Sequence, residues 1–220
     1  MFSATAGSSG LLAPLHFLDT AVFLRLNALH SPAWDPVMRF VSGPWLLALV
    51  HLVLLAAILR AGGWRRPLAK LGLLALVILA DLAGAHLLKD LVRRPRPSWQ
   101  PELTDTIHLV DGRRGGEFGF VSTHTAYAFA VAVFAAAQVR RRRVAALLLT
   151  WAAAVAYSRI YLGLHYPGDV LAGAAWGALT AFAITRLPAR ARAWLAEPPD
   201  RSDSASGGAT PAPALPIASA

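Results

Sequence analysis

Five segments of this 220-residue chain are apolar over a length that can cross a membrane, which takes about 20 residues per helix. Hydrocarbon offers no partners to backbone N–H and C=O groups, so segments that cross it must form helices. We therefore expect an all-α fold, a polytopic membrane bundle of five spanning helices. The expected spans are Phe40–Leu59, Leu71–Leu88, Val121–Val139, Val144–Leu164 and Pro167–Leu187.

The two flanks of these spans are more polar. Residues 15–39 have apolar side chains at helical spacing but also charged and amide side chains, namely Asp19, Arg25, Asn27 and Asp35. We interpret this segment as an amphipathic helix at the membrane interface, with a sixth span as the alternative. From Glu197 the chain turns to Pro, Ala, Ser and Gly, which predicts a disordered cytoplasmic tail. The expected domains are an N-terminal segment (1–39), the membrane domain (40–187) and the tail (188–220).

The basic residues indicate how the helices are oriented. Only 15% of the residues are charged and 56% are hydrophobic, which favours lipid over water, and the net charge is +9. The arginines lie in clusters on alternate connections between the apolar segments, so we expect no nucleic-acid partner. The positive-inside rule makes their side of the membrane cytoplasmic. The clusters are Arg60, Arg65, Arg66 and Lys70, then Arg140–Arg143, then Arg186, Arg190 and Arg192.

Three polar blocks then fall together on the opposite, outer face. They are Lys89, Arg96 and Pro97 in KDLVRRPRP, Ser122 and His124 in FVSTHT, and Arg159, His165 and Asp169 in SRIYLGLHYPGD. Ionisable side chains that face the interior of a membrane bundle are costly, which makes them candidates for function. Two imidazoles, three cations and one carboxylate suit an anion with several oxygens, such as phosphate.

The third block has the order of a nucleophile and its orienting acid. Pro167 favours the first position of a helix, so Asp169 would lie in the first turn, where a carboxylate suits the helix dipole. From there it could accept a hydrogen bond from one ring nitrogen of His165 and fix the tautomer. The other nitrogen is then free to attack phosphorus.

The other two blocks supply groups that hold and protonate a phosphate. Ser122 is a good N-cap, and the N–H groups of Thr123 and His124 would then point outward toward an anion. A protonated His124 could donate to the departing oxygen as a general acid. No cluster resembles a metal site, so cations would take the place of Mg²⁺ and no cofactor is expected. The equatorial oxygens would be held by Lys89, Arg96 and Arg159.

The order and spacing of these blocks resemble the signatures of the type-2 phosphatidic acid phosphatase family, which shares a superfamily with vanadium haloperoxidases. The matching residues are Lys89-x6-Arg96-Pro97, Ser122-x-His124 and Ser158-Arg159-x5-His165-x3-Asp169. The resemblance implies an integral membrane phosphatase of six-helix type that needs no metal and works through a phosphohistidine. It implies that His165 is the nucleophile, Asp169 its partner and His124 the acid, with phosphate bound by Lys89, Arg96, Ser122 and Arg159. The family's middle block usually reads Pro-Ser-Gly-His, whereas Thr123 here places a side chain beside the phosphate.

Each of these residues also has a purely structural interpretation. Lys89 and Arg159 could be anchors that snorkel at helix ends, and His124 and Asp169 could be helix caps. The joint pattern argues against these interpretations. An interhelical hydrogen bond is the preferred interpretation of three other polar residues within the spans, His51, Asp81 and His86.

Two further features leave alternatives open. The charged 93–118 loop is expected to be a solvated surface, or else a lid that selects substrates. Gly173 and Gly177 lie four residues apart in one span, which suits close helix packing. A homodimer through this pair is a possible use of the same motif.

Taken together, the sequence predicts a metal-independent lipid phosphate phosphatase in the cell membrane, with its site on the non-cytoplasmic side. The expected substrates are phosphatidate, phosphatidylglycerol phosphate or a polyprenyl diphosphate, presented by the bilayer. Two rival functions remain, a phosphotransferase that uses the same site and a non-catalytic protein that binds or moves phosphorylated lipids. The five apolar spans exclude a soluble haloperoxidase-like protein.

Overall fold

A computed structural model of the chain describes residues 12–60, 65–139 and 141–187, and its regular secondary structure is helical. One isolated antiparallel bridge, between Pro95 and Phe118, is the only β-type pairing among the described residues. The expected all-α class is therefore confirmed. The α-helices are α1 (Leu12–Asn27), α2 (Asp35–Val41), α3 (Pro44–Arg60), α4 (Arg65–Val92), α5 (Thr123–Val139), α6 (Arg142–Tyr161) and α7 (Pro167–Thr185), and short 3-10 turns form at Pro97–Trp99, Pro101–Leu103 and Val110–Gly112.

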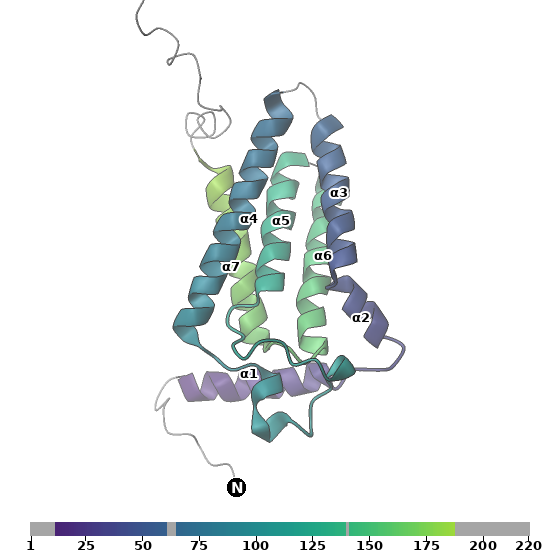
Figure 1. Ribbon diagram of the computed structural model, residues 1–220, viewed down its shortest axis with the longest axis vertical. Coiled ribbons are helices and arrows are strands. Elements are labelled where there is room, and N and C mark those ends of the chain that lie inside the picture. The colour runs from purple at the N-terminus through teal and green to yellow at the C-terminus, as the bar shows by residue number, and fades with distance from the viewer. Residues whose placement is uncertain (1–11, 61–64, 140, 188–220) are drawn as a thin grey trace, which may run out of the picture.

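Helix α5 is the centre of the bundle and packs against α4, α6 and α7 (Figure 1). Its buried face is built largely from alanines, which let the neighbouring backbones approach closely. A Cβ added at Gly173 would lie 2.6 Å from the carbonyl oxygen of Ser122, and one at Gly177 would clash with that of Ala126. The two glycines of α7 therefore pack against α5 within the chain. This face is not free to form the dimer contact that the motif could also have provided.

Within the part of the chain that the structure describes, three helices are long and apolar enough to cross a membrane, namely α4 from Lys70 onward, α6 and α7. The pair α2 and α3, bent by 41° at a short break, would make a fourth span, and α5 is a shorter apolar helix of 17 residues. The expected count of five spans therefore stays a prediction. The expected span at Phe40–Leu59 was wrong at its start, because Phe40 belongs to α2 and α3 begins only at Pro44. Proline cannot continue a helix but is well suited to begin one.

The N-terminal segment forms two helices instead of the single helix expected over residues 15–39. Helix α1 lies across one end of the bundle and α2 leads from it into α3 (Figure 1). Asp19, Phe23 and Asn27 follow each other at helical spacing, and Phe23 and Asn27 are fully buried on the face toward the bundle. Large apolar side chains are instead exposed near the start of α1, namely Leu15, Phe17 and Leu18.

Asn27 explains why α1 is held against the bundle. Its side-chain amide donates to the carbonyl oxygens of Ile160 and Tyr161, at 3.1 and 2.8 Å, and to that of His108. Its oxygen accepts from the backbone N–H of His108 at 2.7 Å. The last carbonyls of a helix have no partner within it, so Asn27 satisfies the end of α6 from another helix.

The ends of the helices separate the basic residues from the polar blocks. Figure 1 shows that α3 ends, α4 begins and α7 ends at the end of the bundle far from α1. Arg142 and Arg143 begin α6 at that same end, and Arg186 follows α7 there. The alternation of basic connections expected from the sequence is thus present among the described residues. The expected tail, residues 188–220, lies outside the described residues.

Candidate active site

The turn between α6 and α7 fixes His165 at the end of the bundle near α1. The N–H groups of Leu164 and His165 both donate to the carbonyl oxygen of Arg159, at 3.1 and 3.2 Å. Gly163 has a φ of +74°, and a Cβ at this position would lie 2.7 Å from the carbonyl oxygen of His108. Only glycine fits such a position without strain. The chain then enters α7 at Pro167, which leaves the His165 side chain completely buried.

His165 is paired with Arg96. Nη1 of Arg96 lies 3.1 Å from Nε2 of His165. A guanidinium can only donate, so Nε2 carries the lone pair and the ring proton sits on Nδ1. Burial, together with the charges of Arg96 and Arg159, holds the pKa of His165 well below its usual value of 6.5. Burial and these charges therefore favour the neutral imidazole, and the lone pair of Nε2 faces a cation.

Asp169 is fully buried in the first turn of α7, as expected, but its hydrogen bonds go elsewhere than expected. Its carboxylate accepts from Nη1 of Arg94 at 2.9 Å and from the backbone N–H of Tyr166 at 3.1 Å. Oδ2 of Asp169 lies 3.7 Å from Nδ1 of His165, which is longer than a hydrogen bond. The two side chains face each other, and the direct bond between them is absent in this arrangement.

Arg94 is the main functional candidate that sequence reasoning missed. The 93–118 loop was expected to be solvated, which was wrong for Arg94: it is mostly buried, and its guanidinium lies 4.2 Å from the ring centre of Tyr166. The signal was the alternation in Arg94-Pro95-Arg96, because residues two apart in extended chain share a face. Apart from Arg96, which belongs to the site, the expectation was correct for the other charged residues of the loop, which are exposed: Arg93, Glu102, Asp105, Asp111, Arg113, Arg114 and Glu117.

Gly119 is the second residue that the sequence did not indicate. Its N–H donates to the carbonyl oxygen of Arg94 at 2.8 Å, next to the bridge between Pro95 and Phe118. A Cβ added here would lie 2.9 Å from Oδ2 of Asp169 and 3.6 Å from Nδ1 of His165. The backbone of the loop thus closes over the pair of side chains, and only a residue without a side chain leaves the space between them clear.

The beginning of α5 is placed as the second block predicted. Helix α5 begins at Thr123, so Ser122 occupies the N-cap position, and its carbonyl oxygen accepts the first intrahelical bond, from Ala126, at 2.9 Å. The hydroxyl of Ser122 is buried and accepts from Thr125 at 3.1 Å. The N–H of Ser122 donates to the carbonyl oxygen of Asp169 at 3.0 Å. This bond ties the start of α5 to the first turn of α7.

Three expected cations converge on both imidazoles. The charges of Lys89, Arg96 and Arg159 all act on His165 and on His124. Arg159 is only 7% exposed, so it is not a snorkelling anchor, and Nη1 donates to the hydroxyl of Ser42 at 3.0 Å. Its Nε is buried without a hydrogen-bond partner, which leaves a donor available for an anion. Lys89 lies in the last turn of α4 and is partly exposed.

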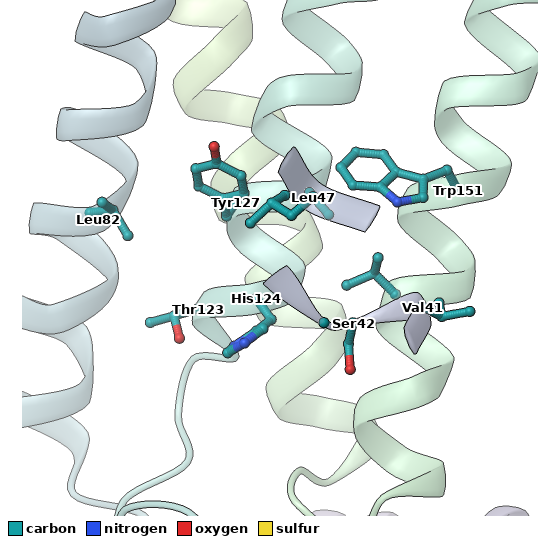
Figure 2. Close-up of a pocket in the computed structure, with 11 residues that line it drawn as sticks. Val41, Ser42, Leu47, Leu82, Thr123, His124, Tyr127 and Trp151 are labelled. Carbon is teal, nitrogen blue, oxygen red and sulfur yellow. The ribbon is translucent and has the colours of Figure 1, made fainter. Parts of the chain in front are cut away.

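A cavity of about 310 Å³ adjoins this group of residues (Figure 2). His124, Thr123 and Ser42 lie at one end of the cavity, and Tyr127, Leu47 and Trp151 lie further along it. The remaining lining is apolar and comes from α2 to α6. A ligand with a polar end near His124 and an apolar body in the cavity would satisfy both parts of this surface. The other lining residues are Val41, Gly43, Leu82, Ala128 and Val155.

The polar residues within the spans do not belong to this site. His51 of α3 is hydrogen-bonded to the hydroxyl of Tyr127 on α5, so the expected interhelical bond is confirmed for this histidine. It was wrong for Asp81, whose carboxylate is buried without a hydrogen-bond partner, while its carbonyl oxygen accepts from Trp176 at 3.3 Å. His86 is exposed on the surface of α4.

Comparison with known proteins finds relatives over most of the chain. The sequence profile of the PAP2 superfamily matches residues 70–193, more than half of the chain. A lipid A 4'-phosphatase of Bacteroides thetaiotaomicron is 39% identical over 163 residues, which cover 73% of this chain and 72% of that protein. A lipid A 4'-phosphatase of Porphyromonas gingivalis is 29% identical over 180 residues, with 81% and 76% covered.

Two solved structures share the fold. LpxE of Aquifex aeolicus superimposes with a TM-score of 0.63 at 24% identity, over 77% of this chain and 95% of that one. A PAP2-type phosphatidylglycerolphosphate phosphatase from Bacillus subtilis gives a TM-score of 0.62 at 22% identity, over 79% and 85%. The family that the three polar blocks predicted is therefore confirmed, and the chain belongs to the PAP2 superfamily of type-2 phosphatidic acid phosphatases.

Proposed function

We propose that this membrane protein is a lipid phosphate phosphatase that removes a phosphate monoester by way of a phosphohistidine on His165. The observation that carries the proposal is the pairing of a buried, neutral His165 with Arg96 inside a group of three cations. A neutral imidazole is the nucleophilic form, and the cations suit the charge of a phosphoryl group. The apolar cavity beside His124 suits a lipid as the remainder of the substrate.

In the first step, Nε2 of His165 forms a bond to phosphorus while the bond from phosphorus to the lipid oxygen breaks. His124 supplies the proton that this oxygen needs to leave as an alcohol. Lys89, Arg96 and Arg159 hold the three equatorial oxygens as their charge redistributes. The ring of His165 becomes cationic in this step, and its Nδ1–H faces Oδ2 of Asp169.

In the second step, water attacks phosphorus from the side that the lipid has left. His124, now neutral, takes one proton from this water, and the bond between phosphorus and Nε2 breaks. The products are inorganic phosphate and neutral His165, so the protein returns to its starting state. The place of His124 at the end of the cavity supports both roles, because the lipid oxygen and the water would occupy the same position in turn.

We propose lipid A with a 4'-phosphate as the substrate class, in preference to the glycerophospholipids and polyprenyl diphosphates that the sequence alone left open. The support is the 39% identity to the Bacteroides lipid A 4'-phosphatase over about three quarters of both chains. We also place the site on the non-cytoplasmic side of the cell membrane. This is supported by the basic helix ends, which lie at the opposite end of the bundle.

The test uses protein purified in detergent, with EDTA present, and a panel of four lipids. These are lipid A, phosphatidate, phosphatidylglycerol phosphate and a polyprenyl diphosphate. We expect release of inorganic phosphate, fastest from lipid A, and mass spectrometry should show the loss of the 4'-phosphate. His165→Gln should abolish release, whereas His86→Gln, a matched change at an exposed histidine of α4, should not.

Four results would contradict the proposal. A requirement for Mg²⁺ would show that the three cations do not take the place of a metal. Activity of His165→Gln above a trace would show that His165 is not the nucleophile. Appearance of a phosphorylated acceptor in place of inorganic phosphate would identify a phosphotransferase. Substrate binding without turnover would identify a lipid-binding protein.

A further inference from the structure

We propose that Asp19 of α1 is a positioning residue for the reaction, because it determines how Arg94 holds Asp169 and therefore which oxygen of Asp169 faces His165. The inference rests on the proposed function, since it assigns a role within that mechanism. It concerns a helix at the end of the bundle that contains none of the family's signature residues.

The two ends of the Arg94 guanidinium bind two different carboxylates. Nη1 donates to Oδ1 of Asp169 at 2.9 Å, and Nη2 lies 2.7 Å from Oδ2 of Asp19. Nη2 also lies 3.2 Å from Nδ1 of His16 on α1. The guanidinium rests on the ring of Tyr166, which limits its rotation. One arginine thus joins α1 to the first turn of α7.

This division has a consequence for Asp169. An arginine and a carboxylate that are free to do so pair through two parallel hydrogen bonds, which would engage both oxygens of Asp169. Because Asp19 occupies Nη2, Arg94 holds Oδ1 alone. Oδ2 remains directed toward Nδ1 of His165, at 3.7 Å, and also accepts from the N–H of Tyr166. When the ring becomes cationic, this oxygen is the acceptor that stabilises it.

Asp19 also binds the backbone of α7. Its Oδ1 accepts from the N–H of Gly168 at 2.7 Å, one residue before Asp169. A Cβ added at Gly168 would lie 2.7 Å from Oδ2 of Asp19, so α1 and α7 are in close contact here. Asp19 therefore sets both the position of the helix that carries Asp169 and the partner of its carboxylate.

A purely structural role is separable from this one, because α1 has other anchors. Asn27 makes three donor contacts and one acceptor contact with α6 and the loop. Asp35, further along the N-terminal segment, binds Nε2 of His108 at 2.9 Å and the hydroxyl of Tyr161 at 2.7 Å. Loss of the Asp19 charge therefore leaves α1 attached to the bundle, while Arg94 becomes free to turn toward Asp169.

The decisive variant is Asp19→Asn. Its amide oxygen can still accept from Gly168, but the negative charge opposite Arg94 is lost. We expect kcat for the lipid substrate to fall roughly 10-fold while KM stays within about 2-fold, because the cations that bind phosphate are untouched. Asp19→Glu restores the charge and should recover most of kcat. Asp35→Asn makes the same chemical change on the same segment, and should lower the thermal midpoint of unfolding without lowering kcat.

A second variant keeps the test decisive if Asp19→Asn is poorly folded. Arg94→Lys retains the charge, but a single ammonium cannot serve the two carboxylates at once with the geometry of the fork. It should lower kcat at unchanged KM as well. Unchanged kcat in Asp19→Asn or in Arg94→Lys would overturn the inference, and so would an equal fall in kcat in Asp35→Asn.

The failure of this inference is distinguishable from the failure of the proposed function. If His165→Gln is inactive and Asp19→Asn retains the full kcat, the phosphohistidine mechanism stands and the positioning role is wrong. If His165→Gln remains active, the mechanism itself is wrong, whatever the Asp19 variants do.

Discussion

Nη1 of Arg96 donates to Nε2 of His165 across 3.1 Å, so the nitrogen that we propose as the nucleophile is covered by the cation that should bind the phosphate. A phosphate oxygen that takes over this donor brings phosphorus next to Nε2. The guanidinium then moves from the nitrogen to the oxygen without leaving the site. Arg96 can therefore both fix the tautomer before binding and stabilise charge afterwards.

Replacing this guanidinium tests that double role. Arg96→Lys keeps the charge but loses the planar fork, and hydrogen bonds to charged groups contribute about 1.5–3 kcal/mol, so kcat/KM should fall about 10- to 100-fold. The measurement is phosphate release from the preferred lipid, with Arg93→Lys, an exposed arginine of the same loop, as the control. Wild-type kcat/KM in Arg96→Lys would show that Arg96 acts as a point charge only.

The imidazole of His165 is expected to stay unprotonated in mild acid. Burial first, and then the charges of Arg96, Arg159 and Lys89, hold its pKa well below 6.5. The ring should remain neutral at about pH 5.5, one unit below the usual value. The ¹⁵N NMR signal that disappears in His165→Gln should keep the shift of a neutral imidazole at that pH. A signal that titrates near 6.5 would contradict the neutral nucleophile.

The same shift has a consequence for stability, with a sign that can be checked. The unfolded chain binds a proton at His165 near pH 6.5 and the folded chain does so only at lower pH. The free energy of unfolding should therefore fall as the pH drops below 6.5. The groups that face this ring are Lys89, Arg96, Arg159, His124 and Asp169. His165→Gln should flatten this part of the stability curve, and an unchanged curve would contradict the assignment.

Gly119→Ala should impair the reaction more than the fold. The new methyl group would lie 2.9 Å from Oδ2 of Asp169, in the space between this oxygen and His165. A displacement of about 1 Å at a reacting group can cost 10²-fold, so kcat should fall by roughly that factor. Gly116→Ala is the matched control, because a Cβ there meets nothing within 4 Å. Equal activity of the two variants would show that the space between Asp169 and His165 has no role in the reaction.

The role of His124 can be tested through the leaving group. His124→Gln should slow release of a lipid alcohol by about 10²–10⁴-fold, because an alkoxide needs a proton to leave. The burst of nitrophenol from p-nitrophenyl phosphate should be affected much less, since nitrophenolate leaves without one. The comparison isolates the first step of the reaction. An equal loss on both substrates would assign His124 to binding instead of proton transfer.

The cavity should recognise the apolar part of the substrate. Leu47→Trp fills it, whereas Leu49→Trp adds the same ring to the exposed side of α3. Leu47→Trp should raise KM for a long-chain lipid phosphate roughly 10-fold and leave KM for p-nitrophenyl phosphate unchanged. If Leu49→Trp has the same effect, or Leu47→Trp has none, the lipid binds elsewhere.

Hydropathy was enough to predict the all-helical class and its long apolar helices, because lipid permits no other structure for such segments, while the number of spans stays a prediction. It could not predict the break before Pro44, where an apolar run continues through a change of direction. Hydropathy also could not predict which face of α1 packs against the bundle. Its polar residues Asp19 and Asn27 face the bundle while Leu15 and Phe17 are exposed, and the partners of that polar face come from distant segments.

The site residues also fall into those that the sequence could place and those that it could not. His165 and Asp169 could be placed from sequence because they lie four residues apart at the start of one helix. Arg94 and Gly119 could not, because their importance arises where the loop, α1 and α7 meet. The expected bond between His165 and Asp169 followed from spacing alone. The spacing could not reveal that Arg94, from a distant loop, binds the carboxylate of Asp169.

The absence of a side chain at two glycines of α7 sets how closely α7 approaches α5, and therefore how far apart the proposed acid and nucleophile can be. Gly173 places α7 within touching distance of the carbonyl of Ser122, and Gly177 does the same at Ala126 one turn further along. Any larger residue at these positions would act as a wedge between the helix that begins next to His124 and the helix that begins next to His165. The geometry of the proposed active site is thus set from inside the bundle, at two positions that do not line the cavity.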